Sequence, residues 1–200
     1  MTPKQRFLPA ILDLVVPVLK GAGFRRKGST FTLTISDDVH MVVQMMIVRP
    51  IVDGAMELRP HVYIYSHRFA QLGRDWEGPP DLCMSAIDIA VSRLVDRRDH
   101  GLWRIGTESE AKAAGSVIVD QICRGALPLV SRVQTADQIC DALIQDPSLN
   151  IARNFKVEEW CQRYRAATGG PPFEPRDYTQ QLEKEAVMLE GIHETLKKLG

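Results

Sequence analysis

The segment 19–50, LKGAGFRRKGSTFTLTISDDVHMVVQMMIVRP, changes from helical to strand periodicity within about ten residues. Apolar residues up to Leu19 recur every three or four positions, which is typical of one face of an α-helix. Residues 30–36 alternate between apolar side chains and threonine, and residues 39–48 are almost all apolar, which predicts a half-buried strand followed by a central one. The aspartates at 37–38 supply the turn. A helix followed by an antiparallel hairpin places the chain in the α+β class.

The remaining elements follow from the same two periodicities and from capping signatures. Thr107-Glu-Ser-Glu110 and Thr135-Ala-Asp-Gln138 both have the spacing of a capping box. Short connections favour an antiparallel meander of about four strands packed against helices. The further predicted elements are helices over residues 4–21 (ended by Gly21 or Gly23), 82–98 (with Asp81 as N-cap), 107–123, 135–145, 156–167 and 177–199, and strands over 58–66 and 101–106.

The chain divides into an α+β domain over residues 1–150 and a C-terminal helical extension over 151–200. Residues 168–175, TGGPPFEP, break the helical pattern between the last two predicted helices. In the last helix, leucines at 182, 189 and 196 recur every seven residues, which is too short a repeat to specify a coiled coil. This helix is expected either to dock on the protein's own core or to pair with a second copy or another protein.

Basic and acidic side chains balance, with 25 of each in 200 residues. Binding to duplex nucleic acid through bulk charge requires an excess of lysine and arginine, so nucleic acid is disfavoured as a partner. No apolar run reaches the about 18 residues that span a membrane. The apolar N-terminal stretch is interrupted by Asp13 and Pro17 and has helical spacing, which favours a mature amphipathic helix over an export signal.

The four cysteines, Cys83, Cys123, Cys140 and Cys161, form no Cys-x-x-Cys pair, and each lies in a helical pattern. Their mostly apolar neighbours predict buried or half-buried reduced thiols in a cytoplasmic protein. A catalytic cysteine would need a histidine partner and an electropositive setting.

Gln44 interrupts the apolar strand MVVQMMIV. Because a buried amide without a partner costs about 1–3 kcal/mol, Gln44 is expected to brace a neighbouring backbone or to line a polar groove with His61 and Tyr63. His61 and His67 share the strand parity of Tyr63, but six residues of extended strand separate them by about 20 Å. One ion cannot bridge that distance, so no metal or cofactor is expected.

Two further segments are candidate binding surfaces. Arg25 and Arg26 precede Lys27 and Gly28, and this run is either an anion-binding turn or a solvated charged stretch that protects a sheet edge. The predicted loop at 67–80 either forms a binding lip or folds back over the core.

The order of these segments resembles the domain-of-unknown-function family 4304 over about residues 5–146. The resemblance implies an α+β fold, a largely bacterial range and no established activity. The chain departs from the pattern at His61, where a small polar residue is expected. The residues that carry the resemblance are Gly23, Phe24, Arg25, Arg26, Gly28, Phe31, Gln44, Trp103, Arg104, Ile105, Leu127 and Pro128.

No Gly-x-Ser-x-Gly, His-Glu-x-x-His or P-loop motif occurs, so no catalytic residue is expected. The favoured interpretation is a cytoplasmic, bacterial-type binding or interaction module without enzymatic activity. The alternative is a small enzyme with a polar pocket around Gln44, His61, Tyr63 and Trp103.

Overall fold

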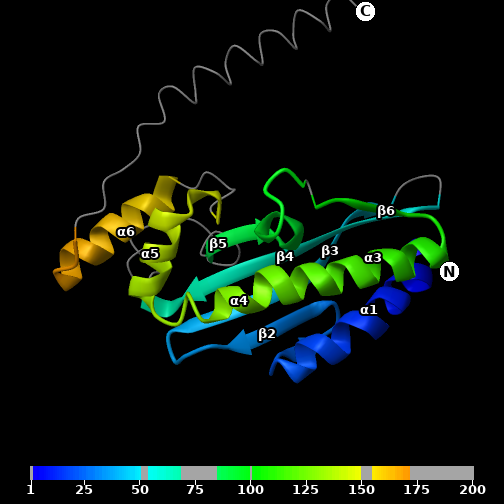
Figure 1. The fold of residues 1–200 in the computed structure, drawn as a ribbon, viewed down its shortest axis with the longest axis horizontal. Helices are drawn as coiled ribbons and strands as arrows, with labels where there is room; N and C mark the ends of the chain where they lie inside the picture. The colour runs from blue at the N-terminus through cyan, green and yellow to red at the C-terminus, as the bar shows by residue number, and fades with distance from the viewer. Residues whose placement is uncertain (1, 51–53, 69–84, 100, 150–154, 172–200) are drawn as a thin grey trace, which may run out of the picture.

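The computed structural model describes residues 2–50, 54–68, 85–99, 101–149 and 155–171. A six-stranded antiparallel sheet with strand order β1-β2-β3-β4-β5 runs through the molecule, and β6 pairs with the start of β4 (Figure 1). The strands are β1 Arg25–Lys27, β2 Thr30–Thr34, β3 Val39–Pro50, β4 Met56–Ser66, β5 Ser85–Ala90 and β6 Trp103–Ile105. The helical elements are α1 Pro3–Gly21, η1 Val91–Leu94, α3 Glu108–Gln121, the π-helical segment η2 Ile122–Ala126, α4 Leu127–Val130, α5 Ala136–Gln145, η3 Pro147–Leu149 and α6 Phe155–Thr168.

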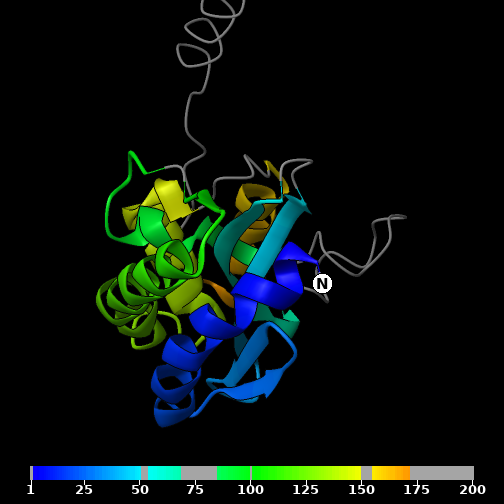
Figure 2. The same ribbon diagram turned by 90° about the vertical axis from the view of Figure 1, so that its right-hand side faces the viewer.

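The helices α1 and α3 pack on one face of the sheet (Figures 1 and 2). Strand residues of one parity point to these helices and are fully buried, among them Phe31, Met41, Val43, Val62 and Ile64. Because side chains alternate across a strand, residues of the other parity form the opposite face of the sheet. The predicted α+β class and the antiparallel arrangement are therefore confirmed.

The N-terminal helix begins with a capping box between Thr2 and Gln5 and ends where Gly23 adopts a φ of +89°. At that end the amide of Phe24 donates to the carbonyl of Leu19 at 2.9 Å, which satisfies one of the last free carbonyls. Of the two glycines proposed as the cap, Gly23 has the left-handed conformation. The N-terminal stretch is the amphipathic helix that its spacing predicted.

The helix predicted over 107–123 begins as expected but runs on to Val130. Thr107 and Glu110 form the predicted capping box, and α3, η2 and α4 then follow without a break. This stretch, Glu108–Val130, is long and apolar enough to cross a membrane by length and composition, and 44% of its most apolar window is buried inside the protein. A helix in the core of a globular protein has the same properties.

The helix predicted over 82–98 is wrong. In the described part of that segment, β5 and the short 3-10 helix η1 take its place. The strand SAIDIA places Ile87 and Ile89 on the buried face and pairs with β4, whose backbone would otherwise end in an unpaired edge. Together with β1, it raises the sheet from the predicted four strands to six.

The predicted helices over 135–145 and 156–167 are confirmed as α5 and α6. The Thr135 side chain caps α5 by accepting from the amide of Gln138 at 3.2 Å. Cys140 and Cys161 are buried, as predicted, whereas Cys123 is exposed. Cys83, Asp81, residues 69–80 of the predicted loop and the helix over 177–199 lie outside the described residues, and the division into 1–150 and 151–200 stays a prediction.

Candidate functional site

Three of the residues predicted to line a polar groove lie together on the face of the sheet opposite α1 and α3. Gln44 of β3 pairs directly with His61 of β4, and Tyr63 lies two residues further along the same strand. Asp88 of β5 pairs with Tyr63 and brings a carboxylate to the group. We call Gln44, His61, Tyr63, Tyr65 and Asp88 the polar face.

A histidine–carboxylate pair lies at the centre of the polar face. His61 Nδ1 is 2.9 Å from Oδ1 of Asp88, and the His61 side chain is only 14% exposed. The other ring nitrogen, Nε2, is buried and has no hydrogen-bond partner among the described residues. Burial, with the charge of Asp88 and the neighbouring Tyr65 adding to it, raises the pKa of Tyr63 to about 12. Tyr63 is therefore a neutral phenol at physiological pH.

The structure separates the remaining predicted site residues from this group. Trp103 pairs with Leu58, which points to the helices, so Trp103 packs against the core on the opposite side of the sheet. Arg25 shares the parity of the polar face through its pairing with Thr32, whereas Arg26 has the opposite parity. Both arginines belong to the exposed edge strand β1, as expected for charges that protect a sheet edge.

The histidines do not assemble a metal site within the described parts of the chain. His40 and His67 approach each other at 3.0 Å between their Nε2 atoms. His61 is paired with Asp88 instead. No group of three histidine, cysteine, aspartate or glutamate side chains with metal-binding geometry occurs among the described residues.

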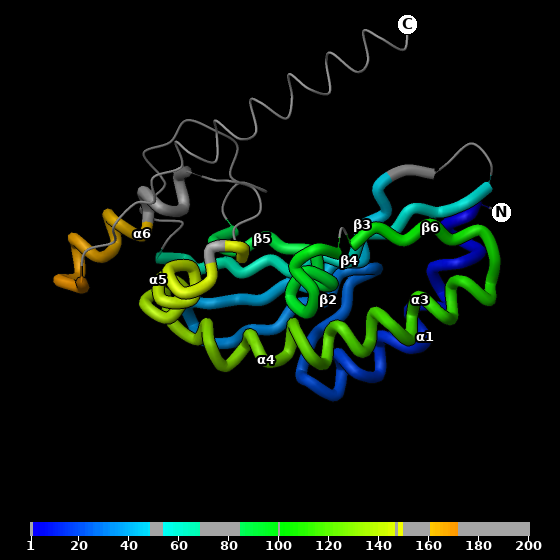
Figure 3. Tube along the Cα trace, turned by 45° about the horizontal axis from the view of Figure 1, so that its top comes forward, coloured from blue at the N-terminus to red at the C-terminus, as the bar shows by residue number. Residues whose placement is uncertain are grey.

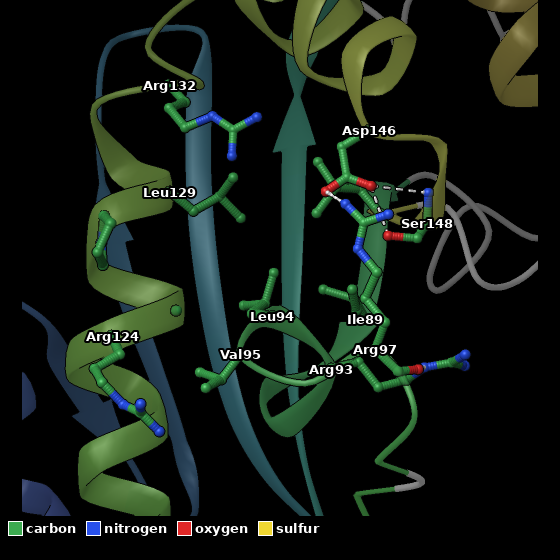
Figure 4. A pocket seen from close by; sticks show the side chains of 13 residues that line it. Ile89, Arg93, Leu94, Val95, Arg97, Arg124, Leu129, Arg132, Asp146 and Ser148 are labelled. Atoms are coloured by element: carbon green, nitrogen blue, oxygen red, sulfur yellow. Dashed lines mark hydrogen bonds and ion pairs between the residues drawn. The ribbon is translucent and has the colours of Figure 1, made fainter.

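A pocket lined by arginines lies between η1, the helix Glu108–Val130 and η3 (Figure 4). Its volume is about 170 Å³. Figure 3 shows α3 and α4 as one continuous helix. The segment η1 packs against this helix at Gly125, and residues of both line the pocket. We call it the arginine-lined pocket; its lining residues are Ile89, Arg93, Leu94, Val95, Arg97, Arg124, Gly125, Pro128, Leu129, Arg132, Asp146, Ser148 and Leu149.

Local geometry of the helix brings two of the arginines to the same wall. Arg124 lies within the helix Glu108–Val130, whereas Arg132 lies in the turn two residues beyond its end, and both line the pocket. The first of them lies in the π-helical segment η2, a type of irregularity that is frequent at functional sites. Gly125 lets the helix approach η1 closely, because a Cβ atom there would be 2.6 Å from Cβ of Leu94.

The opposite wall contributes two more arginines and the carboxylate. Arg97 Nη2 lies 2.9 Å from Oδ2 of Asp146, and the Arg93 side chain donates to the carbonyl of Arg97 at 3.2 Å. Asp146 also accepts hydrogen bonds from the backbone and hydroxyl of Ser148 (Figure 4). The lining therefore holds four guanidinium groups and one carboxylate.

Two of the arginines keep donors available within the described structure. Arg124 is 61% exposed and pairs with Asp120 one turn earlier, at 2.7 Å, in a pair that is itself solvent-accessible. The exposed Arg132 makes no ion pair among the described residues (Figure 4). Each guanidinium carries five donors in a planar fork, so the pocket concentrates positive charge and hydrogen-bond donors at one place.

This pocket was not predicted from the sequence. The spacing of Arg124 and Arg132 around Pro128 predicts two cations on one helix face, but the helix ends at Val130 and Arg132 reaches the pocket from the turn that follows. The segment at 93–97 was assigned to a helix, which hid its contribution. No local sequence pattern predicts that residues 93–97, 124–132 and 146–149 lie next to one another in the fold.

The fold and these two surfaces define an α+β protein with an arginine-lined pocket beside its sheet and a histidine–carboxylate pair on its polar face. No protein-family model matches the chain, and neither a curated protein nor a solved structure matches it. The resemblance to domain-of-unknown-function family 4304 stays a prediction.

Proposed function

We propose that this chain is a non-enzymatic binding module that takes a phosphate group of its ligand in the arginine-lined pocket. The observation that carries the proposal is that four arginines, Arg93, Arg97, Arg124 and Arg132, line one cavity whose lining includes a single carboxylate, Asp146. Arginine binds phosphate oxygens through two parallel hydrogen bonds, and such charge-assisted bonds are about twice as strong as neutral ones.

The size of the pocket restricts the ligand. Pockets that enclose a drug-sized molecule have volumes of about 300–1,000 Å³. The arginine-lined pocket has about 170 Å³, which is below that range. This volume suits one phosphoryl group and its immediate ester better than a whole nucleotide.

The cellular location and the macromolecular partners proposed for the module are argued from the sequence. The lack of a Cys-x-x-Cys pair and the reduced thiols support a cytoplasmic location, and the resemblance to family 4304 supports a bacterial one. A second copy or another protein, bound through the helix predicted over 177–199, remains the proposed macromolecular partner. Balanced charge, with 25 basic and 25 acidic residues, argues against nucleic acid.

Isothermal titration calorimetry with inorganic phosphate and with phosphoserine tests the proposal. R132Q is expected to weaken binding about tenfold, because a hydrogen bond to a charged group contributes about 1.5–3 kcal/mol and 1.4 kcal/mol is a factor of ten. The control is R98Q, which removes the same charge from an exposed arginine outside the pocket lining. Equal weakening by both variants, or no binding of either probe, would overturn the proposal.

A small enzyme built on the polar face is the second candidate. The observation that favours it is the His61–Asp88 pair at 2.9 Å, in which the buried Nε2 has no partner among the described residues. This is the arrangement in which a carboxylate orients an imidazole for general-base catalysis. Hydrolysis of p-nitrophenyl acetate or phosphate that is lost in H61Q and kept in H40Q supports this candidate. Turnover that H61Q leaves unchanged would exclude His61 as the base.

A further inference from the structure

The interface between α5 and α6 contains two cysteines whose thiols meet inside the protein. Cys140 of α5 and Cys161 of α6 are both fully buried in the core. Asp137, Cys140 and Asp141 share one face of α5, and Cys161, Tyr164 and Arg165 share one face of α6. The contacts of Tyr164 with Asp137 and of Arg165 with Asp141 bring these two faces together, with Cys161 among the side chains that interact with Cys140. Twenty-one positions separate the two residues (161 minus 140), so only the packing of the two helices brings them together.

A buried cation lies beside this thiol pair. The guanidinium of Arg165, on α6, is only 5% exposed and interacts with the Cys140 sulfur. It forms an ion pair with Asp141 of α5, but its Nε atom is buried without a hydrogen-bond partner among the described residues. An arginine donor that is buried and unsatisfied favours an anion next to it, and the neighbouring group that can become one is the Cys140 thiol.

Asp137 is a second charged neighbour of Cys140, and its carboxylate weakly disfavours ionisation of the Cys140 thiol. Asp137, which accepts a hydrogen bond from the Tyr164 hydroxyl at 3.2 Å, acts against the thiolate. The hydrogen bond from Cys161 lowers the pKa of Cys140 most, and Arg165 lowers it further against the effect of burial. The balance lowers the pKa of the Cys140 thiol below its ordinary value of 9.0, so Cys140 is the proposed attacking thiol.

We propose that Cys140 and Cys161 are a redox-active dithiol, which a hydroperoxide converts into a disulfide between α5 and α6. This inference is independent of the arginine-lined pocket. A reversible covalent link at this place would fix α6 against α5, in addition to the contacts of Arg165 with Asp141 and of Tyr164 with Asp137.

The reaction needs two steps and one equivalent of hydroperoxide. The Cys140 thiolate attacks the outer peroxide oxygen, the O–O bond breaks, and the leaving alkoxide or hydroxide takes up a proton. Cys140 is then a sulfenic acid. The Cys161 sulfur attacks the Cys140 sulfur, the S–O bond breaks, and its oxygen leaves as water with the Cys161 proton. Two thiols and one hydroperoxide thus give one disulfide, one alcohol or water molecule, and one further water molecule.

Access to the sulfurs requires α6 to separate locally from α5, since both cysteines are fully buried. Local openings of this kind occur in folded proteins at free energies below that of global unfolding. Hydrogen peroxide is small enough to enter through such an opening. Oxidation is therefore expected in the folded protein, at a rate set by the opening and by the thiolate fraction of Cys140.

The test uses the full chain with Cys83→Ser and Cys123→Ser, so that the pair is the only source of thiols. Treating the folded protein with hydrogen peroxide is expected to remove two hydrogen atoms from its mass. Peptide mapping should show a Cys140–Cys161 disulfide that dithiothreitol reverses. A sulfinic or sulfonic acid without the cross-link would overturn the proposal, as would oxidation only after unfolding.

Two variants test the role of the arginine. R165Q is expected to slow disulfide formation, because each unit by which the pKa of Cys140 rises reduces its thiolate about tenfold. R163Q removes the same charge from an exposed position on α6 and should leave the rate unchanged. Equal rates in R165Q and R163Q would exclude Arg165 as the activating group, while the mapping in the parent protein still decides whether the dithiol reacts.

Discussion

Replacing Gly125 by alanine tests the contact that shapes the arginine-lined pocket. The added Cβ would lie 2.6 Å from Cβ of Leu94 and 3.2 Å from Cγ2 of Val95. Carbon atoms in proteins pack best at about 3.5–4.0 Å, so the helix and η1 must move apart by several tenths of an ångström. The pocket lies between these two elements, and G125A should therefore widen it.

The expected loss of stability follows from two opposing effects. Overpacking a core contact costs about 1–3 kcal/mol, whereas replacing a helical glycine by alanine contributes up to about 1 kcal/mol in favour of folding. The net loss is expected to be about 1 kcal/mol, with an upper value of about 2 kcal/mol. For a chain of this size, 1 kcal/mol lowers Tm by about 2–4 °C.

The matched control is G115A in the same helix. Its Cβ would lie 2.9 Å from Cδ1 of Leu14 and 3.3 Å from Cα of Ile11, so it overpacks the contact between α1 and α3. Gly115 does not line the pocket. Thermal unfolding should show a similar loss in both variants, whereas calorimetry with phosphate should show weaker binding in G125A alone. A Tm of G125A above that of the parent, or equal weakening of phosphate binding in both variants, would refute the reasoning.

Three further predictions concern the two partners of a capping box, Thr107 and Glu110, and the buried phenol of Tyr63. T107A should destabilise the protein by about 0.5–2 kcal/mol in chemical denaturation, because it removes the cap of α3; an unchanged midpoint would contradict the capping role. Hydrogen bonds from the Gly106 and Thr107 amides lower the pKa of Glu110 below its ordinary value of 4.5. The ionised Glu110 carboxylate therefore stabilises the fold above pH 4.5, and this stabilisation is lost as the pH falls through the lower pKa that Glu110 has in the folded protein. The difference in unfolding free energy between the parent and E110Q should accordingly shrink in acid. Burial raises the pKa of Tyr63 from 10.0 to about 12. The contribution of the neutral phenol to folding stability is therefore complete below pH 10 and is lost as the pH rises towards 12. Alkaline denaturation should be less steep in Y63F, and an identical profile would show that Tyr63 titrates normally.

Elements with a clear local signal were predicted well. The helical spacing before Leu19, the alternation in residues 30–34 and the capping residues Thr107 and Thr135 all identified real element boundaries. Such signals are reliable because the interactions that produce them lie within a few residues of one another. For Gln44, the sequence left two alternatives open, and the register Gln44↔His61 places it beside His61, as the alternative with His61 and Tyr63 required.

The failures arise where a distant partner determines the local structure. Residues 85–90 have apolar side chains at positions compatible with a helix, yet they form β5 because the edge of β4 supplies backbone hydrogen-bond partners. Trp103 was predicted to share a polar pocket with Gln44, His61 and Tyr63 in the alternative interpretation. Its pairing with Leu58 turns it to the opposite face of the sheet.

By itself, the sequence determined the fold class, the antiparallel hairpin, the helix caps and the parity that places His61 and Tyr63 on one face of their strand. Periodicity and capping depend on interactions within a few residues, so both can be recognised in the amino-acid sequence. Only the tertiary structure decided the six-stranded sheet, the meeting of Cys140 with Cys161 and the arginine-lined pocket. Each of these depends on elements that are far apart along the chain and are held together by burial of apolar surface, a force that has no direction and leaves no local pattern.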